Sequence, residues 1–582
     1  MKRIAIFFCL AIVCTGIVWA THGTAAPAGP PLSKYIPAGP LLYLASKDFA
    51  SLLSDWNSSR QKKQWVQSDD YEVFSRSRLF LRLKGAGDQF AAAAGLPPDM
   101  DFLSQVSGER SVLALYDIGN LQFLYITYLP SAKSLDTSLW RTREKFEPRS
   151  AGGVNFYLRR DPESKREVAF AISGDFLLLA TREDLIAGAL QLMSGKADRT
   201  VESEQWWSQS TGAAGQPGDP RMVLNLEKLV PNGYFRTYWA QQNITDLSQY
   251  SAAVSDLFRS SSQYREERVL IRKKKLDELA AVEGLAAAAD VARLSPDDAG
   301  LYVATASPAP DSCFAMLENK LLAPHLGPSP SSQMAPQVQL TSGEQGEGSD
   351  LETRIDQIST QRPVAQSIST LQELLRKTQI LASLQVQSTE VQSTEVKSTE
   401  NQSTEADNSR VFVRMHSAVV LVAASDWREA DVRLAVADFV RPSLTAGQLV
   451  VRWQQKSGYA ELDGLWPLSV SVHGKYLLIS DQPALIQSML SNFNRKSDRK
   501  PAQLLAGFNH ARERSNFVRF ASLVDRPNVG MRNGIGNARQ PQFFSGNMAS
   551  LSSTLAAVSA ERIEVRSDGD QVRQTVTYEW SQ

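Results

Sequence analysis

One phrase occurs twice in this chain and constrains its fold more than any other feature. ISGDFLLLATREDLIAGALQLM occupies positions 172–193, and VHGKYLLISDQPALIQSMLSNF occupies 472–493, 300 positions later. In the first copy, FLLLA (Phe176–Ala180) is a continuous apolar run, which indicates a strand covered on both faces. Apolar residues then recur with helical periodicity at Leu185, Ile186, Ala189, Leu190 and Met193. The phrase therefore predicts a buried strand followed by an amphipathic helix.

The second copy repeats these features. Gly474 stands where Gly174 does, just before the strand, where a tight turn needs glycine. Thr181 and Asp184 have the spacing of a capping box before the first helix. Ser480 or Asp481 is the corresponding cap before the second, and Pro483 falls in its first turn. Apolar residues occupy the same five helical offsets: Leu485, Ile486, Met489, Leu490 and Phe493.

Further landmarks favour an internal duplication over a chance likeness between two strand–helix units. PAGPLLYLA at 37–45 is echoed by PDDAGLYVA at 296–304, and ERVLIR at 267–272 by ERIEVR at 561–566. The landmarks occur in the same order, with offsets of 259, 300 and 294 positions. Since a net insertion in the second copy explains the change in offset, the sequence predicts two tandem repeats.

The insertion is expected at 327–408, which is rich in Ser, Gln, Thr, Pro and Glu. Four pentapeptides, VQSTE VQSTE VKSTE NQSTE, follow one another at 386–405. Such a tract buries too little apolar area to offset its ordering entropy, so we expect a low-complexity, disordered insert with one possible helix at 364–384. Slippage during DNA replication also produces such repeats, so they need not have a function.

The remaining pattern predicts an α+β fold of two duplicated lobes, each a mostly antiparallel sheet with helices packed on one face. The expected organisation is a signal peptide (1–26), a first repeat (33–275), the start of a second repeat (276–326), the insert (327–408) and the rest of the second repeat (409–582). Within the repeats we expect strands at 41–46, 111–116, 122–128, 154–159, 167–172, 222–226, 301–306, 418–423, 448–454, 468–472, 476–480, 517–520, 563–566 and 572–580. Helices are expected at 48–56, 70–83, 135–146, 247–258, 427–440 and 547–558.

The N-terminus resembles a secretory signal. Lys2 and Arg3 precede an apolar run at 4–20, which has the length of a signal sequence rather than of a membrane span. The small-residue sites that end at Ala20 and Ala26 are suited to cleavage by signal peptidase. An uncleaved anchor is the alternative. We therefore expect a periplasmic or secreted protein with no transmembrane segment after cleavage. Two of the three cysteines lie in this signal, so the mature chain keeps Cys313 alone and forms no internal disulfide.

Composition and motifs indicate no particular chemistry. Basic and acidic residues balance at 62 each, which argues against a nucleic-acid partner. The histidines lack metal-binding spacing, His473 is expected in a turn, and Cys313 is expected to be a buried residue rather than a nucleophile. GIGNAR at 534–539 lacks the strand–helix context of a dinucleotide loop. We therefore predict no catalytic, cofactor-binding or metal-binding residue and no cofactor.

Two segments remain as weak surface candidates. RKKK at 272–275 is expected to be a solvated run, with contact to an anionic polymer as the alternative. GYFRTYWAQQ at 233–242 carries four aromatic residues, which favour a helix packed on the sheet over a platform for glycans or peptides.

Hydrophobic patterns over most of the chain resemble those of a bacterial family. YIPAGPLLYLASKDFASLLSDW, the GDFLLLATREDLIAGALQLM unit and MVLNLEKL are similar to exported proteins grouped as domain of unknown function 3352. The resemblance implies a secreted or cell-envelope protein and brings no catalytic residues. We therefore expect a non-catalytic binding or scaffold protein whose partner is an envelope protein or glycan. The alternatives are an envelope hydrolase without a linear motif and an assembly or chaperone-like factor.

Overall fold

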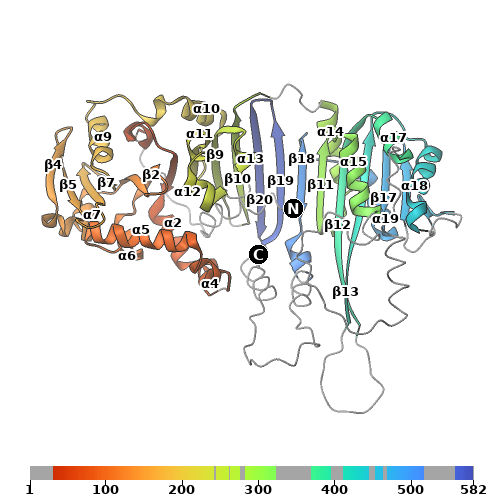
Figure 1. Cartoon of the computed structure of the whole chain (residues 1–582), viewed down its shortest axis with the longest axis horizontal. Coiled ribbons are helices and arrows are strands. Elements are labelled where there is room, and N and C mark those ends of the chain that lie inside the picture. Colours follow the sequence, from red (N-terminus) through yellow and green to blue (C-terminus); the bar gives the residue numbers. More distant parts are fainter. Residues whose placement is uncertain are drawn as a thin grey trace, which may run out of the picture. The chain divides into compact units, whose positions relative to one another are not determined.

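The computed structural model describes residues 30–580, apart from 68, 241–243, 261, 276–281, 323–368, 395–409, 445–451, 463–467, 515 and 517–557. The chain divides into two compact units (Figure 1). Unit 1 comprises 1–279 and 517–582, and unit 2 comprises 280–516. Among the described residues, no helix is long and apolar enough to cross a membrane.

Unit 1 contains an antiparallel sheet in which the strands pair in the order β4-β5-β6-β7-β3-β2-β1-β8-β9-β10-β20-β19. The bounds are β1 (Leu42–Asp48), β2 (Glu109–Asp117), β3 (Gln122–Tyr128), β4 (Glu147–Ala151), β5 (Val154–Arg160), β6 (Glu167–Ser173), β7 (Phe176–Ala180), β8 (Arg221–Asn225), β9 (Tyr250–Arg259), β10 (Gln263–Arg272), β19 (Val558–Ser567) and β20 (Gln571–Trp580).

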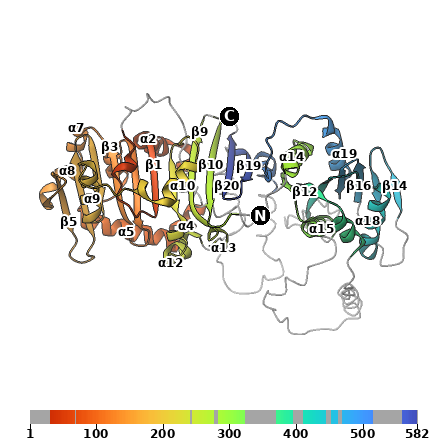
Figure 2. The same ribbon diagram turned by 90° about the horizontal axis from the view of Figure 1, so that it is seen from above.

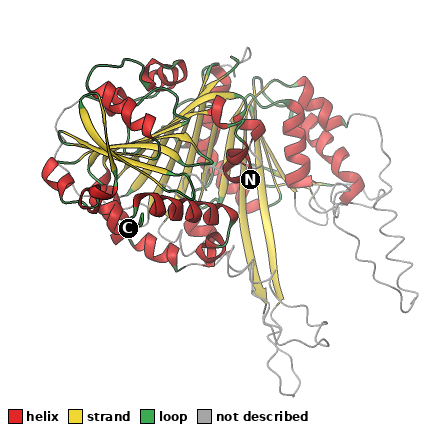
Figure 3. Cartoon of the chain, turned by 60° about the vertical axis from the view of Figure 1, so that its left-hand side comes forward, coloured by secondary structure: helices red, strands yellow, loops and turns green. Residues whose placement is uncertain are grey.

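Unit 2 contains a second antiparallel sheet, with the order β14-β15-β16-β17-β13-β12-β11-β18. The bounds are β11 (Leu301–Ala306), β12 (Ile380–Thr394), β13 (Arg410–Ala423), β14 (Trp453–Gln455), β15 (Ala460–Leu462), β16 (Leu468–His473), β17 (Tyr476–Ser480) and β18 (Leu504–Phe508). The paired β12 and β13 are the longest strands of this sheet and are prominent in Figure 3.

Strands β1 to β8 and β11 to β18 pair in the same order. The hairpin registers also agree, since Ser173 pairs with Phe176 in β6–β7 and His473 pairs with Tyr476 in β16–β17. Gly174 and Gly474 occupy these turns with φ values of 58° and 57°, which confirms the predicted need for glycine. The α+β class is confirmed. The duplication stays a prediction, and the shared strand order is the observation in its favour.

Helices cover both faces of each sheet, which corrects the expected arrangement with helices on one face (Figure 3). The reason is that the central strands are apolar on both sides, as the FLLLA run indicates. In unit 1, one face packs against η1 (Leu32–Tyr35), α9 (Glu183–Met193), η3 (Val201–Ser203) and α10 (Gln205–Ala213). The other packs against α2 (Phe49–Ser58), α5 (Arg78–Ala94), α6 (Met100–Val106) and α8 (Ser138–Arg141), and α7 (Ser131–Leu135) and η2 (Arg143–Lys145) adjoin these helices.

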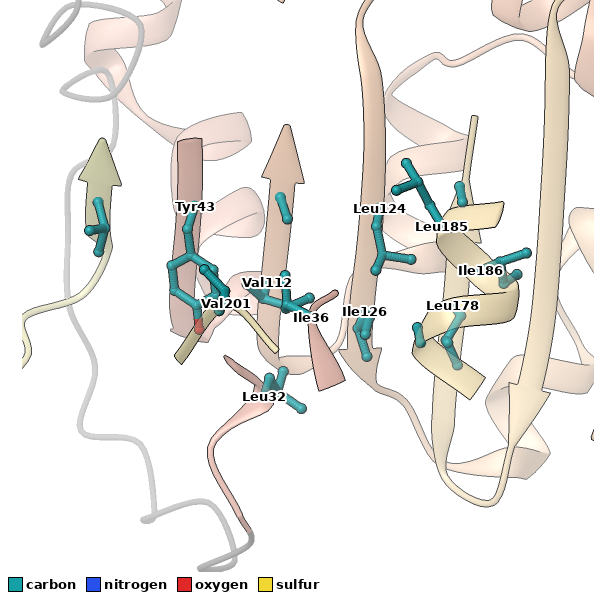
Figure 4. Close-up of a cluster of buried hydrophobic side chains, with 14 of the residues drawn as sticks. Leu32, Ile36, Tyr43, Val112, Leu124, Ile126, Leu178, Leu185, Ile186 and Val201 are labelled. Carbon is teal, nitrogen blue, oxygen red and sulfur yellow. The ribbon is translucent and has the colours of Figure 1, made fainter. Parts of the chain in front are cut away.

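The core under α9 shows how the repeated phrase folds (Figure 4). Leu185 and Ile186 of the helix pack with Leu124, Ile126 and Leu178 of the sheet, and all five are at most 4% exposed. Burying each such side chain stabilises the fold by about 1.5–3 kcal/mol. The predicted helical face is therefore the face that packs on the sheet.

The other helices, some visible in Figure 2, complete the two units. In unit 1 they are α3 (Arg60–Val66), α4 (Asp69–Ser75), α11 (Leu226–Leu229), α12 (Gly233–Phe235), η4 (Arg236–Ala240) and α13 (Ile244–Leu247). In unit 2 they are α14 (Val282–Val291), η6 (Ala292–Leu294), α15 (Pro310–Leu317), η7 (Glu318–Leu322), α17 (Thr370–Lys377), α18 (Glu429–Leu444), α19 (Pro483–Ser491) and η9 (Asn492–Asn494).

The helix expected at 247–258 is wrong, because most of this range forms strand β9. Residues 252–254, 256 and 257 are buried, which fits a strand that lies between β8 and β10. Pairing on both sides outweighs the helical preference of its alanines. The helix expected at 547–558 and the strand expected at 517–520 lie outside the described residues, except that Val558 begins β19.

Part of the insert expected to be disordered at 327–408 is ordered. Residues 370–377 form helix α17 with Leu371 and Leu375 fully buried, and β12 includes the first nine residues of the pentapeptide tract, 386–394. Valine and threonine favour strands, and β11 and β13 supply pairing on either side of β12. In the shared strand order, 418–423 in β13 takes the place of β3, because β13 pairs with β12 and β17 as β3 pairs with β2 and β7. Residues 327–368 and 395–408 lie outside the described residues.

The two compact units do not follow the order of the chain throughout. One break lies near 279, and 517–582 groups with unit 1. The reason is the long pairing of β20 with β10, which runs from Gln263 and Glu579 to Ile271 and Gln571. The landmark ERIEVR lies in β19 and ERVLIR in β10, so the two occupy different positions in the hairpins β9–β10 and β19–β20.

Candidate functional site

The candidate site is a cavity of about 560 Å³ in unit 1, which we call the apolar cavity. It lies between one face of the sheet and the helices α2, α5 and α6. Its volume falls in the range of about 300–1,000 Å³ that is typical of small-molecule sites. The sheet contributes Leu44, Leu113, Leu115, Phe123, Tyr125 and Leu179, and the helices contribute Phe49, Leu52, Leu83, Phe90, Phe102, Leu103 and Val106.

Strand register places the sheet residues side by side. Leu44 pairs with Leu113, Leu113 with Tyr125, and Tyr125 with Leu179, so these four side chains form a row across β1, β2, β3 and β7. Because side chains alternate along a strand, the neighbouring row faces the core under α9 instead. In these apolar strands, alternate side chains therefore face the packed core under α9 and the cavity on the other side of the sheet.

The helices complete the cavity with a regular stripe. On α5, the lining residues Leu83, Ala86, Gly87 and Phe90 have the i, i+3, i+4, i+7 spacing of one helical face. Two of the four are alanine and glycine, so the middle of the stripe leaves space that larger side chains would fill.

Exposure differs between the two faces of the same strand. On β2, Val112 and Ala114 face the core under α9 and are at most 1% exposed, whereas Leu113 and Leu115 face the cavity and are only half-buried. These half-buried aliphatic side chains border the open space of the cavity, so they can contact whatever enters it. The cavity is therefore suited to hold either water or an apolar ligand.

A second hollow, of about 870 Å³, adjoins the apolar cavity, and we call it the polar cleft. Both are lined by the same five residues, Gln89, Asn120, Arg166, Glu167 and Thr181. The cleft is otherwise lined by Gln122, Ser164, Lys165, Arg182, Glu183 and Asp184. The five shared residues form the border between an apolar and a charged space.

Thr181 belongs to this border and does not cap helix α9 as predicted. Its hydroxyl accepts a hydrogen bond from the Phe123 backbone N–H at 2.8 Å, because it lies where β7 meets the start of β3. Helix α9 has Arg182 at its N-cap, with no side-chain cap. In unit 2, Ser480 and Asp481 likewise bond to the backbone of Ser417, and Gln482 is the N-cap.

Most charges of the polar cleft are paired. Glu167 binds Arg160 and accepts the Glu183 backbone N–H at 3.0 Å, and Arg182 binds Asp184. Arg166 instead donates to two neutral oxygens, from Nε to Gln89 Oε1 at 2.9 Å and from Nη1 to the Asn120 carbonyl at 2.6 Å. Among the described residues, neither Arg166 nor Lys165 forms an ion pair with a carboxylate.

The turn that supplies Asn120 is held by Asp117. Burial alone would raise the pKa of this carboxyl, but donors from Asn120 and Gly119, together with the charge of Arg166, bring its pKa below the ordinary value. The carboxylate accepts both backbone N–H groups at 2.8–3.0 Å. The ionised form therefore fixes the loop that positions Arg166.

The residues singled out in the sequence lie elsewhere. Cys313 is fully buried on α15, where burial raises the pKa of the thiol to about 12, and His473 lies at the β16–β17 turn as predicted.

Of the aromatic segment, Phe235 is buried and Tyr234 packs against the same core, which supports the helix-packing interpretation. Lys273, Lys274 and Lys275 are exposed. GIGNAR lies outside the described residues, and those that are described contain no cluster suited to a metal ion.

Sequence reasoning missed the apolar cavity because its walls come from β1, α2, α5, α6, β2, β3 and β7, which no local pattern connects. One usable signal was the α5 stripe, in which Ala86 and Gly87 interrupt larger apolar residues at core spacing. A small-residue gap in an otherwise apolar face is a sign of unfilled space.

Replacing Gly85 by alanine is expected to stabilise the protein by about 0.5–1 kcal/mol, since glycine is unfavourable inside a helix. An added Cβ would meet no atom within 4 Å. Gly174→Ala is the control and should destabilise, because the residue has a φ of +58°. Urea unfolding measures both changes, and a loss of stability in Gly85→Ala would show that α5 is not continuous there.

Comparisons with known proteins leave the family open. No family model matches the chain, and no curated protein matches it. Among solved structures, crystal forms I, IV and III of TP0453 are similar with TM-scores of 0.22, 0.22 and 0.21. Their identities are 11%, 11% and 10%, and each match covers 43% of this chain and 82–84% of the other. At these TM-scores the likeness supports no conclusion about fold or function.

Proposed function

We propose that this protein is a non-catalytic binding protein whose unit 1 holds an elongated apolar molecule, such as an acyl chain, in the apolar cavity. The predicted N-terminal signal makes the bacterial cell envelope the proposed site of action. The observation that carries the proposal is the row of half-buried aliphatic side chains on β1 and β2, facing a space of about 560 Å³.

The lining favours binding over hydrolysis. No histidine or cysteine is among the described residues that line either the apolar cavity or the polar cleft. Ser111, a hydroxyl of the apolar cavity, lies 2.6 Å from Thr127 Oγ1 and 3.3 Å from Tyr125 Oη, so it belongs to a small hydroxyl network. A nucleophile would need a base, which this network does not provide.

A tryptophan placed in the cavity tests the proposal. Ala86→Trp projects from the α5 stripe and is expected to weaken binding of the uncharged fluorophore N-phenyl-1-naphthylamine by at least about tenfold, since the indole would occupy the ligand volume. Ala92→Trp is the matched control, because Ala92 is exposed on the same helix and does not line the cavity.

Fluorescence titration measures the affinities, and circular dichroism checks that both variants fold. The proposal is supported if the wild type and Ala92→Trp bind the fluorophore alike and Ala86→Trp does not. It is rejected if the wild type shows no saturable binding, or if a folded Ala86→Trp binds as well as the wild type.

A further inference from the structure

The border between the apolar cavity and the polar cleft indicates a ligand that has a polar end as well as an apolar chain. Gln89, Asn120, Arg166, Glu167 and Thr181 line both spaces. A molecule that fills the apolar cavity and reaches its border therefore meets a guanidinium group. This arrangement suits an amphiphile, with its chain on one side of the border and its head group on the other.

The Arg166 guanidinium is oriented by two neutral oxygens and forms no ion pair among the described residues. Gln89 Oε1 and the Asn120 carbonyl accept from Nε and Nη1, and Nη2 has no hydrogen-bond partner among the described residues. The side chain is half-buried, so its charge is less screened than that of an exposed arginine. An arginine held in this way presents a fixed donor to a carboxylate or phosphate oxygen.

Two basic residues of the cleft lie outside its ion pairs. Of its three acidic residues, Glu167 is paired with Arg160 and Asp184 with Arg182. Glu183 is thus the remaining acidic residue, opposed by Lys165 and Arg166. Lys165 is exposed and adjacent to Arg166, at a φ of 60° in the turn between β5 and β6. The lining of the cleft thus has three basic and three acidic residues, and Lys165 and Arg166 are the two basic residues that form no ion pair among the described residues.

We propose that the site takes an anionic amphiphile, whose chain fills the apolar cavity and whose carboxylate or phosphate head is bound by Arg166, with Lys165 contributing charge. This inference rests on the proposed function but is separable from it, because the uncharged fluorophore tests the cavity alone. A head group bound in this way increases affinity through a charge-assisted hydrogen bond, for which a gain of about 10- to 100-fold is expected.

Displacement of N-phenyl-1-naphthylamine by three ligands with the same chain tests the inference: hexadecanoic acid, hexadecyl phosphate and hexadecan-1-ol. For the wild type, at least one anion should bind about tenfold or more tightly than the alcohol, and raised salt should reduce this preference. The tighter anion identifies the head group: hexadecanoic acid indicates a fatty acid, and hexadecyl phosphate indicates a phospholipid-type head.

Variants at Arg166 test whether this residue causes the preference for an anion over the alcohol. Arg166→Met should reduce the preference for the anion to less than about threefold, with fluorophore and alcohol binding unchanged, and Arg166→Lys should retain part of it. Arg149→Met is the control, since Arg149 is a surface residue of β4 that binds Glu147. If Arg166→Met fails to fold, Arg166→Gln replaces it.

Two outcomes would overturn the inference and leave the proposed function standing. One is equal binding of the alcohol and both anions to a wild type that binds the fluorophore. The other is an Arg166 variant that folds, binds the fluorophore and keeps the full preference for anions. Loss of fluorophore binding by the wild type would instead reject the proposed function itself.

Discussion

Asp256→Ala is expected to lower the free energy of unfolding by about 3–5 kcal/mol, because it leaves a buried positive charge without its partner. Asp256 lies on β9 with its side chain 3% exposed, and Arg221 on β8 is 15% exposed. The carboxylate accepts from Arg221 Nε at 2.6 Å, from Arg221 Nη2 at 2.7 Å and from the Gly218 N–H at 2.9 Å. Urea unfolding measures the change.

The same substitution should also weaken fluorophore binding, since Pro220 lies between Gly218 and Arg221 and lines the apolar cavity. Asp136→Ala is the control, because Asp136 is 78% exposed in its pair with Arg141, and its loss should be below about 1 kcal/mol. Replacing both Asp256 and Arg221 by leucine should recover most of the stability. A loss in Asp256→Ala no greater than in Asp136→Ala would contradict the assignment of a buried, structurally essential pair.

Phe102→Ala is expected to cost about 3–5 kcal/mol of stability and to enlarge the site. Phe102 is 4% exposed on α6, lines the apolar cavity, and contacts Phe90 edge-on with ring centroids 5.9 Å apart. Because the removed ring adds volume to the cavity, the variant should bind longer-chain fatty acids more tightly relative to hexadecanoic acid than the wild type does. A series of chain lengths measured by fluorophore displacement gives the shift.

Phe146→Ala is the matched control for this enlargement. Phe146 is 5% exposed in the same core cluster and contacts Phe170 edge-on, but it does not line the apolar cavity. It should lose similar stability and keep the chain-length preference of the wild type. A chain-length shift of the same size in both variants would mean that loosening of the core, and not added volume, changes the selectivity.

The elements that were predictable from the sequence are those with strong local periodicity. The turn glycines Gly174 and Gly474, the apolar β7 and β17, and the faces of α9 and α19 all occur where the pattern places them. The closing hairpin of β19 and β20 was also predictable, since SDGD marks its turn and Gly569 has a φ of 98°. In these segments the local preference and the tertiary environment agree.

The elements that were not predictable depend on neighbours distant in sequence. Strand β9 has the alanines of a helix former but lies between two other strands. Strand β12 extends into the pentapeptide repeat that was expected to be disordered, and it pairs with β11 and β13. The caps at Thr181 and Asp481 were misassigned for the same reason, because backbone groups of β3 and β13 compete for these side chains.

The candidate site depends even more on long-range geometry. No local motif relates Leu44 to Leu113 or Tyr125, yet strand register places them in one row. Arg166 was one of 62 basic residues in the sequence, and its distinction is that its hydrogen bonds go to neutral oxygens. Burial and partner identity are properties of the folded chain, so the sequence alone could not select it.

The pairing of β20 with β10 has a consequence for how the polypeptide acquires its shape during synthesis. The edge of strand β10 stays unpaired until strand β20 has been synthesised, which happens only after residues 280–516 have been made. An unpaired edge strand can pair with other chains and cause aggregation, and charged side chains on the strand reduce this tendency. Strand β10 carries Arg265, Glu266, Glu267 and Arg268 in succession, so the nascent first unit is expected to bear its own protection against aggregation until translation nears completion.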